Sequence, residues 1–534
     1  MIVPELRPWR AARAHVVRAA GAVRPRLARA ARAAEPRFAR FTRATAPRPA
    51  RVTRTQTWQY TAGAATAGLA LAAGVVTAAG PWDSTGQRTA ERDRAVALER
   101  TGGVDHGRGS GGSGTTSGAP RPAPSADSVL AGLGDGSGGV PGGAKAAPTA
   151  EALADVLGPL LDDPALGTHR GAAVVDLTTG KRLYGRGADT ALTPASTIKI
   201  ATAVAALTAL GPDHRLTTRT ALEADTGELV LVGGGDPTLT ARKDARGLAS
   251  LRTLAEKTAA ALKKRDVRKV TLSYDTTLYA GTETHPIGVN ENLARVTALM
   301  ADEARTDDST SGPAPRVPDP AADAARAFAG FLKRHGVTAS PPGPSKATDR
   351  AGTLATVSSP PLASLVERML TNSDNDIAEA LARHTALATG EAAGFDGVSA
   401  AVPARLRQLG LPVRGARFHD GSGLDRTDRI TADLLTALLA KAADPDRPEL
   451  RPVLTGLPVA GFTGTLTSRY PDGAAGLVRA KTGTLTGVNT LAGTMVTEEG
   501  RLLGFAFLAS ETTDAWSAQT ALDHLATALA SGSA

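Results

Sequence analysis

Ser196 and Lys199 are spaced for nucleophilic catalysis by a serine in this 534-residue chain. A serine hydroxyl is a weak nucleophile at neutral pH and needs a base within hydrogen-bond distance. Residues three positions apart share one face of a helix, so the spacing predicts that the lysine amine lies beside the hydroxyl. A lysine serves as a base only when burial or a nearby positive charge lowers its pKa. Lys481, in the run Lys481-Thr482-Gly483, is a candidate source of that charge.

Each of these groups also has an ordinary structural explanation. Ser196 and Lys199 fit a helix-capping serine beside a solvated lysine, and Lys481 fits the start of a strand. A third polar group, Ser373-Asp374-Asn375, fits a turn between two helices. The order of the three groups along the chain favours the catalytic interpretation, because chance rarely places all three in sequence.

In that order the groups spell S-x-x-K, S-x-N and K-T-G, the motifs of penicillin-recognising serine acyl-transferases. The chain resembles the class C low-molecular-mass penicillin-binding proteins, which are D-alanyl-D-alanine carboxypeptidases/endopeptidases. Ser373 lies 177 positions after Ser196, a spacing that leaves room for an inserted domain, as in that family. Three further stretches resemble family motifs: Leu457–Gly461, Asp420–Leu424 and Gly233–Pro237. Taken by their residues alone, the second and third indicate only tight turns.

The resemblance implies a role for each residue of the first two motifs. Ser196 would be the nucleophile and Lys199 its base. Ser373 would relay a proton to the leaving amine, and the Asn375 amide would hold the lysine and bind the substrate backbone. Asp374, between them, should point away from the site.

The third motif would bind the substrate. Lys481 and Thr482 suit the terminal carboxylate of a D-Ala-D-Ala stem peptide, and Gly483 allows a close backbone approach. By resemblance, the backbone N–H groups of Ser196 and Thr484 would form the oxyanion hole.

Other candidate residues carry weaker signals. Asp275 opens a segment that resembles a family D-x-S-x-F element and would bind the amino group of a diaminoacid, although an ordinary strand-end aspartate fits equally well. Thr463–Thr467 echoes the third motif but lacks its lysine. His384 and His419 have no ligand-like spacing, so we expect no Ser-His-Asp triad, no metal and no cofactor. The absence of cysteine excludes disulfides, a cysteine nucleophile and thiolate metal sites.

Strand-like and helix-like segments place the motifs in an α+β fold. Strands precede Ser196 and follow Lys481, and the resemblance implies that they pair in one antiparallel sheet flanked by helices, the β-lactamase/transpeptidase-like arrangement. Periodicity alone indicates only α+β or α/β. We expect a catalytic domain in two parts with a mixed α/β domain inserted between them: 150–212 and 353–534 for the catalytic domain, and 213–352 for the insert.

The region before residue 150 predicts a tether. Residues 1–54 hold 14 Arg and two acids, a charge of +12, so the rest of the chain carries −3 of the total +9. We expect residues 1–58 to be a cytoplasmic arm near anionic lipid; with no nucleic-acid fold beside it, we expect no nucleic-acid partner. Residues 59–81 are uncharged and fit a single transmembrane anchor, or a cleaved signal segment. Residues 82–149 read as a disordered linker, with 15 Gly between positions 101 and 150.

Three functions fit these motifs. The preferred one is an extracytoplasmic serine-type D-Ala-D-Ala carboxypeptidase that is also an endopeptidase. It would act on peptidoglycan stem peptides and be inhibited by β-lactams. A β-lactamase shares the motifs, but the insert and the lack of a recognisable glutamate-bearing deacylation loop argue against it. A non-catalytic wall-binding scaffold conflicts with the retained Ser196, Lys199, Ser373, Asn375 and Lys481.

Overall fold

The computed structural model describes residues 149–223, 225–470, 473–497 and 500–531. All of them belong to one compact unit, Asp135–Ala534. The arm, the apolar segment and the linker predicted above lie outside the described residues, apart from Thr149. Within the described ranges, no helix combines the length and the apolar character needed to cross a membrane.

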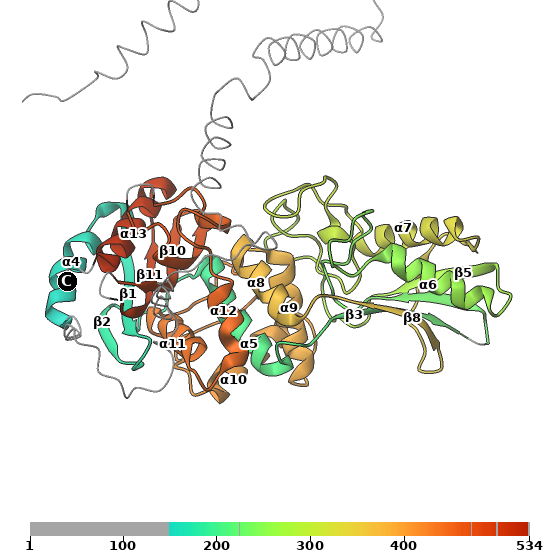
Figure 1. Ribbon diagram of the computed structural model, residues 1–534, viewed down its shortest axis with the longest axis horizontal. Coiled ribbons are helices and arrows are strands. Elements are labelled where there is room, and N and C mark those ends of the chain that lie inside the picture. The colour runs from blue at the N-terminus through green and yellow to red at the C-terminus, as the bar shows by residue number, and fades with distance from the viewer. Residues whose placement is uncertain (1–148, 224, 471–472, 498–499, 532–534) are drawn as a thin grey trace, which may run out of the picture. The chain divides into compact units, whose positions relative to one another are not determined.

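A five-stranded antiparallel sheet forms the centre of the catalytic part, in the order β2-β1-β11-β10-β9 (Figure 1). Strand β1, before Ser196, pairs with β11, near the end of the chain, so that Gly171 lies opposite Leu508. This confirms the predicted pairing of early and late strands. The strands are β1 (His169–Asp176), β2 (Arg182–Arg186), β9 (Val478–Leu485), β10 (Val488–Val496) and β11 (Leu502–Ser510).

Helices cover both faces of this sheet, and the alternation along β1 shows how. Ala172 and Val174 pack into a core with α4 and α13, whereas Ala173 and Val175 pack into a core on the opposite face. The helix that follows Ser196, α5, lies in the second core and is buried on all sides from Lys199 to Leu207. The helices are α4 (Ala150–Leu161), α5 (Lys199–Leu210), α8 (Leu362–Asn372), α9 (Asn375–Ala388), α10 (Phe395–Gln408), α11 (Ala432–Ala443), α12 (Arg451–Thr455) and α13 (Ala515–Ala530).

The insert forms a second sheet with its own core, in the order β6-β5-β4-β3-β8, with β7 paired to β5. It is mixed, because β4 and β5 are parallel whereas β3 is antiparallel to β4 and β8. Figure 1 shows α6 and α7 beside this sheet. The elements are β3 (Thr217–Leu222), β4 (Glu228–Val232), α6 (Leu251–Lys263), β5 (Lys269–Asp275), α7 (Pro320–Arg334), β6 (Thr338–Ala339), β7 (Gly343–Pro344) and β8 (Gly352–Ser358).

The insert ends later in the chain than the expected boundary between residues 352 and 353. Strand β8 pairs with β3 across its whole length, from Gly352 to Ser358, and so belongs to the sheet of the insert. The physical reason is that Ala355 and Val357 pack into the core of the insert. The catalytic part resumes at α8.

Two glycines of the insert give a matched test of its packing. A Cβ at Gly234 would lie 2.0 Å from the Thr217 carbonyl oxygen, whereas a Cβ at Gly330 in α7 meets nothing within 4 Å. We expect Gly234→Ala to lower the free energy of unfolding by about 1–3 kcal/mol. Gly330→Ala should raise it by about 0.5–1 kcal/mol through helix propensity. Urea denaturation measures both, and equal effects would contradict the packing described.

Candidate active site

Ser196 lies on a 3₁₀ turn, Ala195–Ile198, that leads directly into α5. The turn is held from two sides by glycines that leave no space for a side chain. A Cβ at Gly423 would lie 2.0 Å from the Ala195 carbonyl oxygen, and one at Gly483 would lie 2.7 Å from that of Pro194. Ala195 itself has a φ of 46°, in the left-handed region that alanine rarely adopts. The packing therefore fixes the nucleophile in a locally strained backbone.

Lys199 is fully buried, and its amine meets three oxygens that carry no formal charge. Nζ lies 2.8 Å from Ser196 Oγ, 2.7 Å from Asn375 Oδ1 and 2.6 Å from the Ser422 carbonyl oxygen. A neutral amine donates two hydrogens and keeps one lone pair. The amide and the carbonyl accept the two hydrogens, so the lone pair is left for the hydroxyl hydrogen of Ser196. This geometry suits a general base.

Burial is the main cause of a lowered pKa at Lys199, to about 8. The carboxylates of Asp420, Glu379, Asp374 and Asp376 act in the opposite direction, because their negative charge favours the ammonium. None of them touches the amine, which keeps the neutral form accessible near physiological pH.

Lys481 is also fully buried and lies on β9. Its amine donates to Ser373 Oγ at 2.9 Å and to the Thr482 carbonyl at 2.8 Å. Burial, and then the charge of Lys199, lowers its pKa well below the usual range for lysine. Burial, and not a charge on Lys481, therefore accounts for the lowered pKa of Lys199, and Ser373 lies in hydrogen-bond contact with Lys481.

The second motif forms the tight junction between α8 and α9. Ser373 adopts a left-handed conformation with φ of 58° at the end of α8. Asp374 caps α9 by accepting a hydrogen bond from the Ile377 amide at 3.0 Å, and it also lines the cavity that includes Ser196. Asn375 turns its Oδ1 to Lys199 because its Nδ2 donates to the Asn292 carbonyl of the insert at 2.8 Å.

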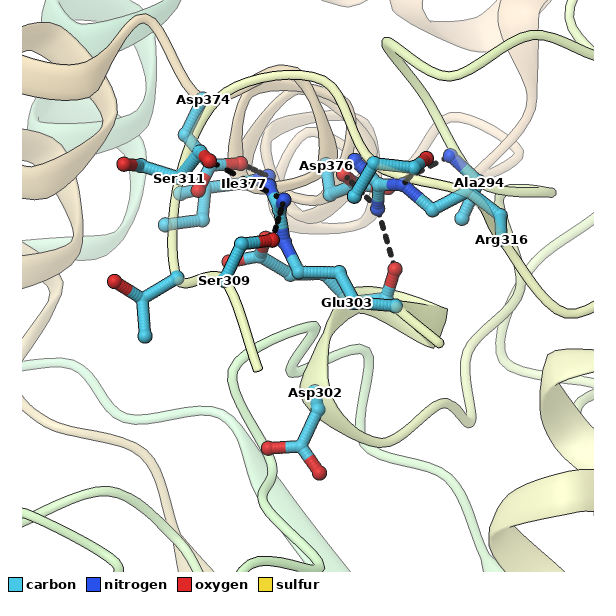
Figure 2. A network of polar contacts seen from close by, with 12 residues as sticks. Ala294, Asp302, Glu303, Ser309, Ser311, Arg316, Asp374, Asp376 and Ile377 are labelled. Atoms are coloured by element: carbon cyan, nitrogen blue, oxygen red, sulfur yellow. Dashed lines mark hydrogen bonds and ion pairs between the residues drawn. The ribbon is translucent and has the colours of Figure 1, made fainter. Parts of the chain in front are cut away.

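Buried ion pairs hold this junction against the insert (Figure 2). Asp376 accepts hydrogen bonds from the Ala294 amide at 3.0 Å and from Arg316 at 2.8 Å. Glu303 lies in the same cluster and pairs with Arg305 and Arg368. Burial, and then the negative charges of Asp374 and Asp376, raises the pKa of Glu303 to about 8.

The third motif borders a cavity of about 290 Å³ that also includes Ser196 and Asn375. Thr482 and Thr484 line it, and Thr482 Oγ1 lies 2.9 Å from Thr465 Oγ1. The strand β9 ends the sheet order; its first residues bond to the backbone of 458–460, and Thr482 and Thr484 further along it line the cavity. A Cβ at Gly483 would lie 2.1 Å from Thr490 Oγ1, so this glycine serves packing within the chain.

The structure brings together all eight residues that the sequence singled out, but several of their contacts were missed. Ser422 and Asn292 reach the site through backbone carbonyls, which leave no side-chain signal. Thr465 lies in the stretch that only echoed the third motif. The turn Asp420–Leu424 resembled a family motif, and that resemblance was the available signal for Ser422.

Asp275 has the contacts of the strand-end aspartate that was one of its two interpretations. Its side chain is buried at the end of β5, and its two oxygens accept the backbone amides of Thr277 and Ala347. These two hydrogen bonds hold the backbone at the end of β5. His384 lies edge-on to Tyr279 and is buried, which lowers its pKa to about 4.

The catalytic fold is that of penicillin-binding proteins. Penicillin binding protein 4 (dacB) from Haemophilus influenzae has a crystal structure that superposes with a TM-score of 0.57 at 21% identity, covering 71% of this chain and 98% of that one. Sequence relatives include "Carboxypeptidase DacB" of Mycolicibacterium smegmatis, 37% identical over 72% of this chain and 85% of its own length. "D-alanyl-D-alanine carboxypeptidase" of Actinomadura sp. is 30% identical over 64% of this chain and 78% of its own length.

The sequence profile of the D-Ala-D-Ala carboxypeptidase 3 (S13) family matches residues 153–307 and 291–529. The chain therefore belongs to the S13 family of serine peptidases. This confirms the resemblance drawn from the three motifs.

The ion pair between Arg316 and Asp376 predicts a large loss of stability when it is broken. Both side chains are at most 4% exposed, so Arg316→Ala leaves a buried carboxylate without its partner. We expect the free energy of unfolding to fall by about 3–5 kcal/mol. Arg326→Ala is the control, because its pair with Asp323 is half exposed and should cost less than about 1 kcal/mol. Similar losses in the two variants would refute the buried pairing.

The pKa of Lys199 predicts how the rate of serine acylation depends on pH. A general base must be neutral, so the rate of serine acylation should rise with pH and reach half its plateau near pH 8. It should fall about tenfold per unit below that point. Stopped-flow acylation by a chromogenic cephalosporin between pH 5.5 and 9.5 measures this. A rate that stays flat through pH 8 would rule out Lys199 as the base.

Proposed function

We propose that Ser196 is the nucleophile and Lys199 the general base of this D-Ala-D-Ala carboxypeptidase. The observation that carries the proposal is the coordination of the Lys199 amine: two uncharged acceptors take its hydrogens and leave its lone pair toward the Ser196 hydroxyl. Membership of the S13 family supports the same reaction.

The reaction proceeds through an ester on Ser196. Its oxygen attacks the carbonyl carbon of the penultimate D-Ala while the hydroxyl proton passes to Lys199. The C–N bond to the terminal D-Ala then breaks. The leaving nitrogen takes the proton that Lys199 received, relayed through Ser373, which is hydrogen-bonded to Lys481, and Lys199 becomes neutral again. Water hydrolyses the ester and restores the serine hydroxyl.

The substrate lies, in this proposal, along the outer edge of β9. Thr482 and Thr484 line the cavity beside Ser196, where Thr482 binds the terminal carboxylate. Lys481 is fully buried behind this surface and acts on it through its hydrogen bonds to Ser373 and the Thr482 carbonyl. The backbone N–H groups of Ser196 and Thr484 receive the negative charge that develops on the carbonyl oxygen. Gly483 supports this role by allowing β9 to lie against the backbone before Ser196.

Peptidoglycan stem peptides are the proposed substrate, with the catalytic part outside the cytoplasmic membrane, where that polymer lies. The Arg-rich arm and the uncharged segment 59–81 support a single membrane anchor, or a signal segment. Cleavage of D-Ala crossbridges uses the same chemistry on a longer leaving amine, so we propose endopeptidase activity as a second reaction. β-Lactams are the proposed inhibitors, and a structure of the Haemophilus influenzae protein complexed with a β-lactam supports this.

Replacement of the nucleophile tests the mechanism. Ser196→Ala should abolish covalent labelling by a fluorescent penicillin, because no other oxygen can form the acyl-enzyme. Ser364→Ala is the matched control on the exposed face of α8 and should label normally. Labelling of Ser196→Ala at the wild-type rate would refute the mechanism.

The substrate is tested with the unmodified enzyme. D-Ala released from stem pentapeptides and monomers released from crosslinked dimers should be scored separately by chromatography. D-Ala alone indicates a strict carboxypeptidase, and both products indicate an endopeptidase as well. Rapid turnover of penicillin without either product would instead indicate a β-lactamase. The absence of both products and of penicillin turnover would indicate a non-catalytic scaffold.

A further inference from the structure

The third acceptor of the Lys199 amine is a backbone carbonyl, and its position depends on the turn that carries it. Ser422 is fully buried, and its carbonyl oxygen lies 2.6 Å from Lys199 Nζ. The Ser422 hydroxyl is 3.2 Å from Asp420 Oδ2, so it does not compete for the lysine. A shift of this carbonyl would move the amine relative to Ser196 Oγ.

Asp420 organises the turn. Its Oδ1 accepts the amides of Ser422 and Gly423, and its Oδ2 accepts the amide of Asp425 at 2.8 Å. Glu379, on α9, accepts the Ser422 amide as well, at 3.0 Å. Burial alone would raise the pKa of Asp420, but hydrogen bonds from His285 and from Gly423 lower it to about 2. The carboxylate is therefore ionised and saturated with donors.

The donor on the outer side of Asp420 comes from the inserted domain. His285 is fully buried, and its Nε2 lies 2.9 Å from Asp420 Oδ2. Its Nδ1 accepts the Ile287 amide at 3.2 Å, so the ring carries its hydrogen on Nε2 and donates it to the carboxylate. Phe395 packs edge-on to the imidazole with ring centroids 5.2 Å apart, which holds the ring in place.

A metal site would be another use for this cluster, since His285, Glu379 and Asp420 bring their ligand atoms within 4.8 Å of one another. The hydrogen bonds argue against it. His285 Nε2 is committed to Asp420, and the two Glu379 oxygens are committed to backbone amides and to Arg383. The cluster is a hydrogen-bonded support for the turn.

We propose that His285 is a positioning residue for the catalytic lysine. It fixes Asp420, Asp420 fixes the Ser422 carbonyl, and that carbonyl fixes the Lys199 amine beside Ser196. The inference rests on the proposed roles of Ser196 and Lys199, and it makes the inserted domain a contributor to acylation.

Three substitutions at one position test this in the full-length enzyme. His285→Ala removes the donor and should lower kcat for D-Ala release by about ten- to hundredfold, with KM changed less than about threefold, because the base is misplaced rather than the substrate. His285→Gln places an amide N–H near the position of Nε2 and should recover kcat to within about threefold of the wild type. His285→Asn is too short to reach Asp420 and should resemble the alanine variant.

Controls separate positioning from general stability. His335→Ala, at the end of α7 in the same domain, should leave kcat and KM unchanged. Circular dichroism and melting temperature are recorded for every variant. If His285→Ala does not fold, the comparison of glutamine with asparagine decides the question.

Two results would overturn the inference: wild-type kcat in folded His285→Ala, or equal kcat in the glutamine and asparagine variants. Both are read against a wild-type enzyme that releases D-Ala and is acylated by penicillin. An inactive wild type would instead contradict the proposed function, so the two failures are distinguishable.

Discussion

Burial of two lysines among uncharged oxygens is the constraint on which the site depends. A lysine works as a base only if its neutral form is populated, and a carboxylate in direct contact would stabilise the charged form. Lys199 meets a hydroxyl, an amide oxygen and a backbone carbonyl. The carboxylates of Asp374, Asp376, Glu379 and Asp420 are kept one layer further out, where they orient backbone amides and cap helices.

That outer layer joins the two parts of the chain. The segment from His285 to Arg316 of the insert supplies the groups that meet the second motif and the turn at Asp420. Most of these contacts are charged and buried, and each would be costly if half of it were missing. The arrangement favours one relative position of insert and catalytic part within the described unit, because a shift would leave a buried charge without its partner.

The sequence was sufficient to predict features that depend on local residue type and spacing. The three motifs and the helix after Ser196 follow from residue type and spacing, and the pairing of early with late strands follows from the family resemblance. The contacts of Asn292, Ser422 and His285 did not follow, because two act through backbone carbonyls and the third lies 135 residues from its partner Asp420. Asp275 illustrates the limit of a short motif, since the same residues fit a substrate contact and a strand-end aspartate, and the contacts that the structure shows are those to local backbone.

The packing of two distant segments around the turn at Ser196 has a consequence for the order of folding. The turn that carries Ser196 is held by Gly423 and Gly483, and the relay partner Lys481 lies on a strand near the end of the chain. Contacts of such long sequence separation form late, because the loop between them must close first. A chain that has not yet formed β9 would thus possess Ser196 without the contacts that fix its position and that of Ser373.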